Sequence, residues 1–176
     1  GFSGYGFGID QTTGLLFLTN IGNTVVFAPT SPITDLNFHH VAVTKSGTQV
    51  IFYIDGVATA PVSYSTNFGF TSNAAIGARG DNDVRNAFFG GIDELSIYNT
   101  PLTAGQITTI YNATSGGKCP ACVGTPVDLV SWWTADGTTN DVRSRNHASP
   151  NGNFFAAGKG AQAFGFNHGQ GLPASG

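Results

Sequence analysis

The distribution of apolar residues along the chain predicts β-strands. Short apolar runs of strand length recur, and glycine, asparagine, aspartate or proline bounds each of them, which is the pattern of strands separated by turns. The runs span Gly14–Asn20, Thr24–Ala28, Phe38–Thr44, Gln49–Ile54, Asn73–Ile76 and Gly91–Tyr98. This spacing is typical of a β-sandwich.

The run Gln49–Ile54 also predicts a hairpin turn after it and its own position in the sheet. The Asp55-Gly56 step follows Gln49–Ile54 directly, and this dipeptide tolerates the positive φ angles of a tight hairpin turn. Side chains alternate between the two faces of a strand, and neither face of Gln49–Ile54 is strongly polar. We therefore expect a central strand of a two-layer structure, covered on both sides.

A single segment has the pattern of a helix. Within Pro101–Asn112, Thr103 is followed three residues later by Gln106, which is the spacing of a capping box. Apolar side chains recur at helical intervals after it, at Leu102, Ile107, Ile110 and Tyr111. The pattern predicts one short, peripheral helix.

Composition supports an all-β chain and excludes one class of partner. The 176 residues include 25 glycines, and helix-forming glutamate and lysine are scarce. A net charge of −3 provides no basic surface for nucleic acid, so nucleic acid is excluded as a partner. No run of about 18 apolar residues predicts a membrane span. Because the chain contains no methionine, even at position 1, we expect it to come from a longer or processed precursor.

The composition changes after the predicted helix. Residues 113–127 read ATSGGKCPACVGTPV, a segment without periodicity that is typical of a linker. It holds Cys119 and Cys122, a single CxxC pair with no second pair to complete a zinc site. We interpret them as a disulfide, local or between chains, in an oxidising exterior.

Two parts of the sequence resemble a known family. The first part carries FHHVAV, QVIFYIDGV, AAIGARGDN and GGIDELSIYNTPLTAGQITTIYN, and the second carries LVSWWTADGTTNDV and AQAFGF. Together they resemble the bacterial laminin-G-like domain of the concanavalin A-like lectin and glucanase superfamily, with Phe38 where tryptophan is usual. The resemblance implies an all-β fold, a two-layer antiparallel β-sandwich of the jelly-roll type with one short peripheral helix.

The two halves of this domain occur in reverse order. Residues 1–115 resemble its C-terminal half, residues 116–127 are the linker, and residues 128–176 resemble its N-terminal opening. The family places the opening strand beside the Ile-Asp-Glu strand, so residues 130–134 should pair with residues 94–98, within one chain or in a neighbouring copy. The residues assigned to this assembly are Val130, Trp132, Trp133, Leu95 and Ile97. Of the two adjacent tryptophans, one should face inward and the other outward.

The sequence argues against catalysis. A retaining glycosidase needs two carboxylates about 5–5.5 Å apart on one face, but Asp93 and Glu94 are adjacent and should point to opposite faces of a strand. His39 and His40 are adjacent as well, and we interpret them as aromatic fillers of a sheet. No Gly-x-Ser-x-Gly motif is present. We expect no catalytic residues.

A structural calcium ion is the cofactor that the resemblance implies. It would lie where the opening loop meets the Ile-Asp-Glu strand, and Ca²⁺ takes carboxylate and amide oxygens as ligands. The matching residues are Asp136, Asn140, Asp141, Asn146, Asp93 and Glu94. The alternative is that residues 136–146 are ordinary turn residues, because Asp and Asn are favoured there.

These observations lead to two hypotheses of function. The first is a non-catalytic extracellular subunit or repeat, structural or adhesive, that assembles head to tail with copies of itself at the cell surface. The second is a carbohydrate-binding module that takes glycans through exposed aromatic side chains. Asn112-Ala113-Thr114 is the one glycosylation pattern in the sequence and designates Asn112.

Overall fold

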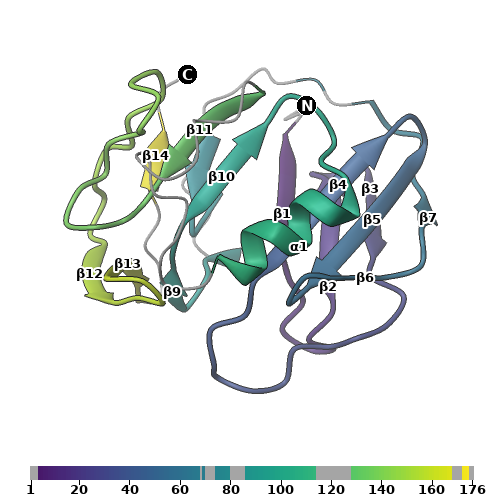
Figure 1. Ribbon diagram of the computed structural model, residues 1–176, viewed down its shortest axis with the longest axis horizontal. Coiled ribbons are helices and arrows are strands. Elements are labelled where there is room, and N and C mark those ends of the chain that lie inside the picture. The colour runs from purple at the N-terminus through teal and green to yellow at the C-terminus, as the bar shows by residue number, and fades with distance from the viewer. Residues whose placement is uncertain are drawn as a thin grey trace. The chain divides into compact units, whose positions relative to one another are not determined.

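The computed structural model describes residues 4–67, 69, 74–79, 86–113, 128–167 and 172–174 (Figure 1). These residues are mostly β-structure in antiparallel sheets, with one short helix, as the sequence predicts. The strands of the first half are β1 (Tyr5–Ile9), β2 (Leu16–Asn20), β3 (Thr24–Phe27), β4 (Val41–Ser46), β5 (Gln49–Ile54), β6 (Val57–Ala58) and β7 (Val62–Ser63). The remaining elements are β8 (Ala74–Ile76), β9 (Gly90–Ile92), β10 (Leu95–Tyr98), α1 (Ala104–Asn112), β11 (Leu129–Trp133), β12 (Phe154–Ala157), β13 (Gln162–Phe166) and β14 (Leu172–Ala174).

The chain forms two compact units. Unit 1 consists of Gly1–Ser72 and Pro101–Asn112, and unit 2 consists of Asn73–Thr100 and Ala113–Gly176. Residues 73–100, which the sequence analysis grouped with the first half, therefore pack with the C-terminal segment. The division into complementary halves of one family domain stays a prediction.

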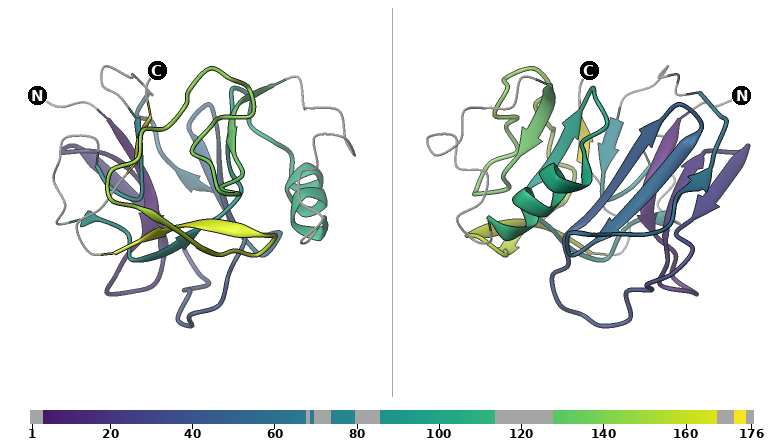
Figure 2. Two further views of the ribbon diagram at one scale, coloured as in Figure 1. Left: turned by 90° about the vertical axis from the view of Figure 1, so that its left-hand side faces the viewer. Right: turned by 45° about the vertical axis from the view of Figure 1, so that its right-hand side comes forward.

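Unit 1 is a sandwich of two small sheets. One sheet has the order β1-β2-β3, and the other has the order β4-β5-β6 with β7 also paired to β5. Figure 2 shows them as purple and blue strands. The core between them includes Leu16 and Leu18 from β2 and Val50 and Phe52 from β5, all at most 4% exposed. Because β5 has partners on both edges, the prediction of a central strand is confirmed.

Two local sequence signals of unit 1 are also confirmed. Asp55 and Gly56 have φ angles of 50° and 78° and join β5 to β6, as expected for a tight turn. At the start of α1, the Thr103 N–H donates to Gln106 Oε1 over 2.8 Å, and the Gln106 N–H donates to Thr103 Oγ1 over 3.3 Å. This reciprocal pair is a capping box, and Ile107 of the helix is buried.

Unit 2 consists of smaller sheets built from distant segments. β10 pairs with β11, β9 joins the β12-β13 hairpin, and β8 pairs with β14. Its core contains Trp133, Phe164 and Phe166, with Ile92 and Leu95 packed against them. The pairing expected between residues 94–98 and 130–134 is present within the chain, where Leu95 lies opposite Trp133 and Ser96 opposite Trp132.

The structure corrects three expectations about strands. Residues 38–40 precede β4 without being part of it, so His39 and His40 are not fillers of a strand. The run 91–98 is divided between β9 and β10, which belong to different sheets, because Glu94 has a φ of 54° that no strand allows. The glycine-rich β1 was absent from the predicted runs, since glycine is a poor strand former.

Candidate functional site

The two tryptophans of β11 are both buried, which corrects the prediction that one faces outward. Trp132 is 3% exposed and Trp133 is 2% exposed. Trp133 packs in the core of unit 2 and its Nε1–H donates to the carbonyl of Asn146 over 2.9 Å. Trp132 lies on the opposite face, where its Nε1–H donates to Glu94 Oε2 over 2.6 Å. The strand is therefore covered on both sides.

Residues 141–146, the loop after β11, are held in place by one carboxylate. Asp141 is 2% exposed, and its Oδ1 accepts the backbone N–H groups of Trp132 and Arg143 over 2.8 and 3.0 Å. Its Oδ2 accepts those of Arg145 and Asn146, both over 3.1 Å. Burial alone would raise the pKa of Asp141, but these four donors outweigh it and hold the pKa below its ordinary value. A single side chain thus fixes residues 141–146 against β11.

The other residues predicted to bind calcium have separate partners. Asp93 Oδ2 accepts the N–H of Lys159 over 2.7 Å, and Asp136 Oδ1 accepts the N–H of Gln162 over 3.0 Å. The Asn146 amide donates to Ser131 Oγ, and Asn140 is exposed. In the described part of the chain, no three His, Cys, Asp or Glu side chains gather to hold a metal ion. The arrangement does not support the calcium site, which stays a prediction.

The residues predicted to mediate assembly lie on the β10–β11 pair. Leu95 is opposite Trp133, Ile97 is opposite Ser131, and the register shifts between Ile97 and Tyr98. Val130 lies at this shift, where it has no direct partner in the register. Ile97 is 44% exposed, so the outer part of this pair reaches the surface.

Two further predictions fall at or beyond the limits of the described residues. Cys119 and Cys122 lie outside them, so the disulfide stays a prediction. Asn112 is the last residue of α1 and is exposed, but Thr114 of its glycosylation pattern lies outside the described residues. Asn112 therefore stays a predicted acceptor.

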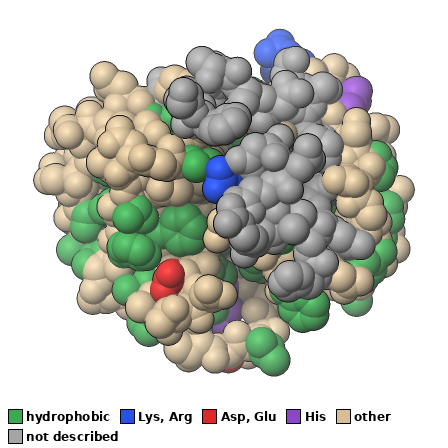
Figure 3. Space-filling view, turned by 180° about the vertical axis from the view of Figure 1, so that it is seen from behind, with side chains coloured by type: hydrophobic (Ala, Val, Ile, Leu, Met, Phe, Trp, Pro, Cys, Tyr) green, Lys and Arg blue, Asp and Glu red, His purple; other side chains and the backbone are tan. Residues whose placement is uncertain are grey.

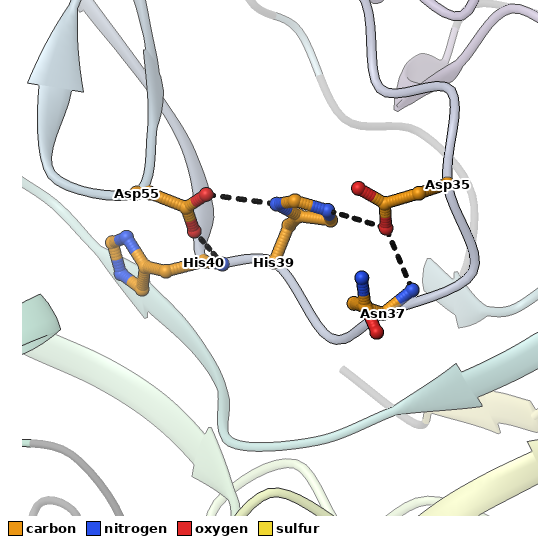
Figure 4. A network of polar contacts seen from close by, with 5 residues as sticks. All are labelled: Asp35, Asn37, His39, His40 and Asp55. Atoms are coloured by element: carbon orange, nitrogen blue, oxygen red, sulfur yellow. Dashed lines mark hydrogen bonds and ion pairs between the residues drawn. The ribbon is translucent and has the colours of Figure 1, made fainter.

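Unit 1 contains a polar cluster that the sequence analysis missed (Figure 4). His39 lies between two carboxylates, with Nδ1 at 2.8 Å from Asp55 Oδ2 and Nε2 at 3.0 Å from Asp35 Oδ1. These bonds, the one to Asp55 foremost, raise the pKa of His39 above its ordinary value against the opposing effect of partial burial. The Asn37 N–H and then His39 hold the pKa of Asp35 low. The spacing of Asp35 and His39 was the only local signal, because the β4–β5 hairpin delivers Asp55.

A cleft opens beside this cluster. It has a volume of about 400 Å³ and lies between the β1–β2 loop and the segment before His39. The lining combines apolar, hydroxyl, amide and carboxylate groups, from Ile9, Asp10, Gln11, Thr12, Thr13, Gly14, Ile33, Thr34, Asp35 and Leu36. The Ile33 N–H donates to the Gly14 carbonyl over 2.9 Å, which holds the two walls together.

The outer face of the β1-β2-β3 sheet carries exposed aromatic side chains. The rings of Phe17 and Phe27 are 6.2 Å apart and tilted by 58°, and Phe27 and Val25 are 40% and 51% exposed. Figure 3 shows hydrophobic side chains gathered on this face, with an acidic side chain beside them. Gly8 of β1 lies under the Phe17 ring, and a Cβ there would be 3.0 Å from it. The glycines of β1 therefore leave room for an aromatic surface.

The antiparallel sheets are those of a β-sandwich. A laminin-G family model, described as the concanavalin A-like lectin/glucanases superfamily, matches residues 1–108. Because the match covers more than half of the chain, the chain belongs to this superfamily, as its motifs predict. A search of curated proteins gives no match.

One solved structure is similar to this chain. It is the 2.1 Å crystal structure of an S-layer domain-containing protein, residues 221–444, from Clostridium thermocellum ATCC 27405. The identity is 18%, the alignment covers 62% of this chain and 64% of that chain, and the TM-score is 0.33. The chain thus spans less than two thirds of that structure. In the described part of this chain, no helix is long and apolar enough to cross a membrane.

Proposed function

We propose that this chain is a non-catalytic extracellular β-sandwich module with a structural or adhesive role, and that it associates with copies of itself by exchanging its tryptophan-bearing segment. The observation that carries the proposal is the β10–β11 pair, in which a segment that follows the predicted linker completes a sheet of unit 2. Membership of a superfamily of lectin-like sandwiches supports the extracellular assignment.

The contacts of β11 are specific enough to serve between copies. They combine a fixed register, two buried tryptophans and the Trp132 to Glu94 hydrogen bond. Exchange of an identical element between protomers repeats the same contacts and requires no new interface. If each copy donates β11 to the next, a head-to-tail fibre results.

The carboxylates of the Ile-Asp-Glu motif support a non-catalytic role. Asp93 accepts the N–H groups of Lys159 and Gly160, whereas Glu94 accepts the Trp132 indole N–H. A retaining glycosidase instead aims two carboxyl groups at one glycosidic bond. These two side chains hold the local backbone and β11.

Refolding at different protein concentrations tests the exchange. We expect the chain to be monomeric after refolding in dilute solution and to form a ladder of oligomers after refolding at high concentration, measured by size-exclusion chromatography with light scattering. Shortening the 114–127 segment should favour oligomers in both cases, because it hinders closure within one chain. A folded monomer at every concentration, even with the shortened segment, would refute exchange.

A second function, carbohydrate binding, is favoured by the cleft and the aromatic face of unit 1. Saccharides bind where polar groups in a concave site meet apolar or aromatic surface, and both features are present at or near β1 and β2. A glycan array probed with the isolated monomer tests it. A reproducible hit that Gln11→Ala or Phe27→Ala weakens would support this function, and an array without hits would count against it.

A further inference from the structure

The cluster around His39 connects one wall of the cleft to a turn on the other sheet. Asp35 lies in the cleft wall, and Asp55 lies in the β5–β6 turn of the β4-β5-β6 sheet. His39 is the side chain that bonds both of them, through its two ring nitrogens. Among the described residues, the charged groups bonded to it are one carboxylate from its own segment and one from the turn.

The chemistry of imidazole makes this bridge dependent on a proton. A neutral ring has one N–H donor and one acceptor nitrogen, whereas the charged ring has two donors. An ionised carboxylate only accepts hydrogen bonds. The two contacts of His39 can therefore both be hydrogen bonds only when the ring carries its second proton, and the neutral ring must face one carboxylate with a lone pair.

We propose that Asp35, His39 and Asp55 form a proton-operated latch on the cleft wall. The protonated ring ties residues 35–39 to the β5–β6 turn, and loss of the proton releases the contact with Asp35. The Asp55 contact persists because the turn holds it independently: the His40 N–H donates to Asp55 Oδ1 over 3.0 Å, and the Asp55 N–H donates to the His40 carbonyl over 2.8 Å. The side of Asp35 is the freer one, with 52% of its side chain exposed against 35% for Asp55.

While the carboxylates are ionised, the latch holds the cleft wall in place below the His39 titration and loosens it as the pH rises through that titration. The Asn37 amide reports on the position of Asp35, since its N–H donates to Asp35 Oδ1 over 2.7 Å. When Asp35 leaves His39, this short turn loses its anchor. The inference concerns the wall itself and does not depend on which ligand the cleft takes, so the failure of either proposed function leaves it intact.

Nuclear magnetic resonance titration of the full chain tests the latch. We expect the His39 ring to titrate above the ordinary histidine range, and Asp35→Asn, a surface substitution, to shift that titration downward. Asp55→Asn should shift it further, because the bond to Asp55 is the shorter.

A second measurement separates a latch from a histidine that merely titrates. The hydrogen-exchange protection factor of the Asn37 amide should fall as pH rises through the His39 titration, and in His39→Gln it should be low and independent of pH over the same range. If Asp35→Asn leaves the His39 titration unmoved, or if Asn37 protection is constant across that titration, the latch is overturned.

Discussion

Unit 1 pairs strands that lie close together along the chain, whereas unit 2, apart from its β12–β13 hairpin, pairs strands that lie far apart in the sequence. In unit 1, β1, β2 and β3 are successive neighbours, and so are β4, β5 and β6. In unit 2, β9 pairs with β13 and β10 with β11, across the whole segment that contains the helix and the predicted linker. Distant pairing costs more chain entropy before it gains contacts. The comparison therefore predicts that the stability of unit 2 depends more on a few buried side chains than the stability of unit 1 does.

The largest expected effect is on unit 2, from Trp133→Ala. Truncation of a fully buried large aromatic side chain costs about 3–5 kcal/mol, and Trp133 is 2% exposed in the core of unit 2. Both tryptophans of the chain lie in this unit, so tryptophan fluorescence reports its unfolding alone. We expect the fluorescence transition of the variant to move to much lower denaturant while far-ultraviolet circular dichroism retains the signal of unit 1.

The matched control is Phe52→Ala, which empties a fully buried site in the core of unit 1. It should lower the dichroism transition first. If both substitutions moved both signals together, the two units would unfold in one cooperative transition. The difference in strand pairing would then produce no difference in stability between them.

Asp141→Asn should give the next largest effect. An amide keeps one acceptor oxygen but turns its NH₂ group toward backbone donors that Asp141 Oδ2 now accepts. Hydrogen bonds to charged groups contribute about 1.5–3 kcal/mol each, so we expect the loss of the two at Oδ2 to lower the free energy of unfolding at neutral pH by about 3 kcal/mol or more.

The same residue sets an acid dependence. The pKa of Asp141 is lower in the folded chain than its unfolded value of 3.8, so its contribution to stability is complete above that value and is lost as pH falls through the folded pKa. Asp141→Asn should flatten this part of the stability profile, followed by tryptophan fluorescence. The control Asp128→Asn changes an exposed aspartate directly before β11, and the two profiles are compared.

A pair of glycines sharpens the comparison within unit 1. Gly14 and Gly22 have φ angles of 72° and 80°, so alanine at either position costs about 1–2 kcal/mol in backbone strain. At Gly14 the new Cβ would also lie 2.5 Å from the Ile33 carbonyl oxygen, whereas at Gly22 it would meet nothing within 4 Å. We expect Gly14→Ala to lower the dichroism midpoint more than Gly22→Ala. Equal effects would show that the Gly14–Ile33 contact is dispensable.

The smallest effect should come from the capping box of α1. Thr103→Ala removes the acceptor of the Gln106 N–H, and loss of an N-cap side chain costs about 1 kcal/mol. Thr100→Ala, one turn earlier and outside the helix, is the control. A thermal melt followed by circular dichroism measures both, and no difference between them would mean that the cap adds nothing to unit 1.

The sequence predicted the features that depend on near neighbours. The Asp55-Gly56 turn and the Thr103–Gln106 capping box are set by residues within one turn, so their dipeptide and spacing signals were sufficient. The pairing of residues 130–134 with 94–98 came from the family resemblance, which supplied long-range information that periodicity lacks.

The features that were missed depend on residues that folding brings together. Three of the four N–H donors to Asp141 lie within five residues of it, as in an ordinary turn. Only the fourth, from Trp132, comes from β11, and no signal in the sequence indicated that bond or the burial of Asp141. Asp55 reaches His39 because the β4–β5 hairpin folds back. Both tryptophans are likewise buried, although strand alternation alone placed one of them on the outside.

The pairing of β11 with β10 and of β13 with β9 joins the residues before 114–127 to those after it by backbone hydrogen bonds as well as by the covalent chain. Cutting the backbone once within residues 114–127 would produce two fragments that still share a sheet and a core. They should remain bound to each other and migrate as one particle until denaturant is added, and separately produced fragments should reconstitute the fold on mixing.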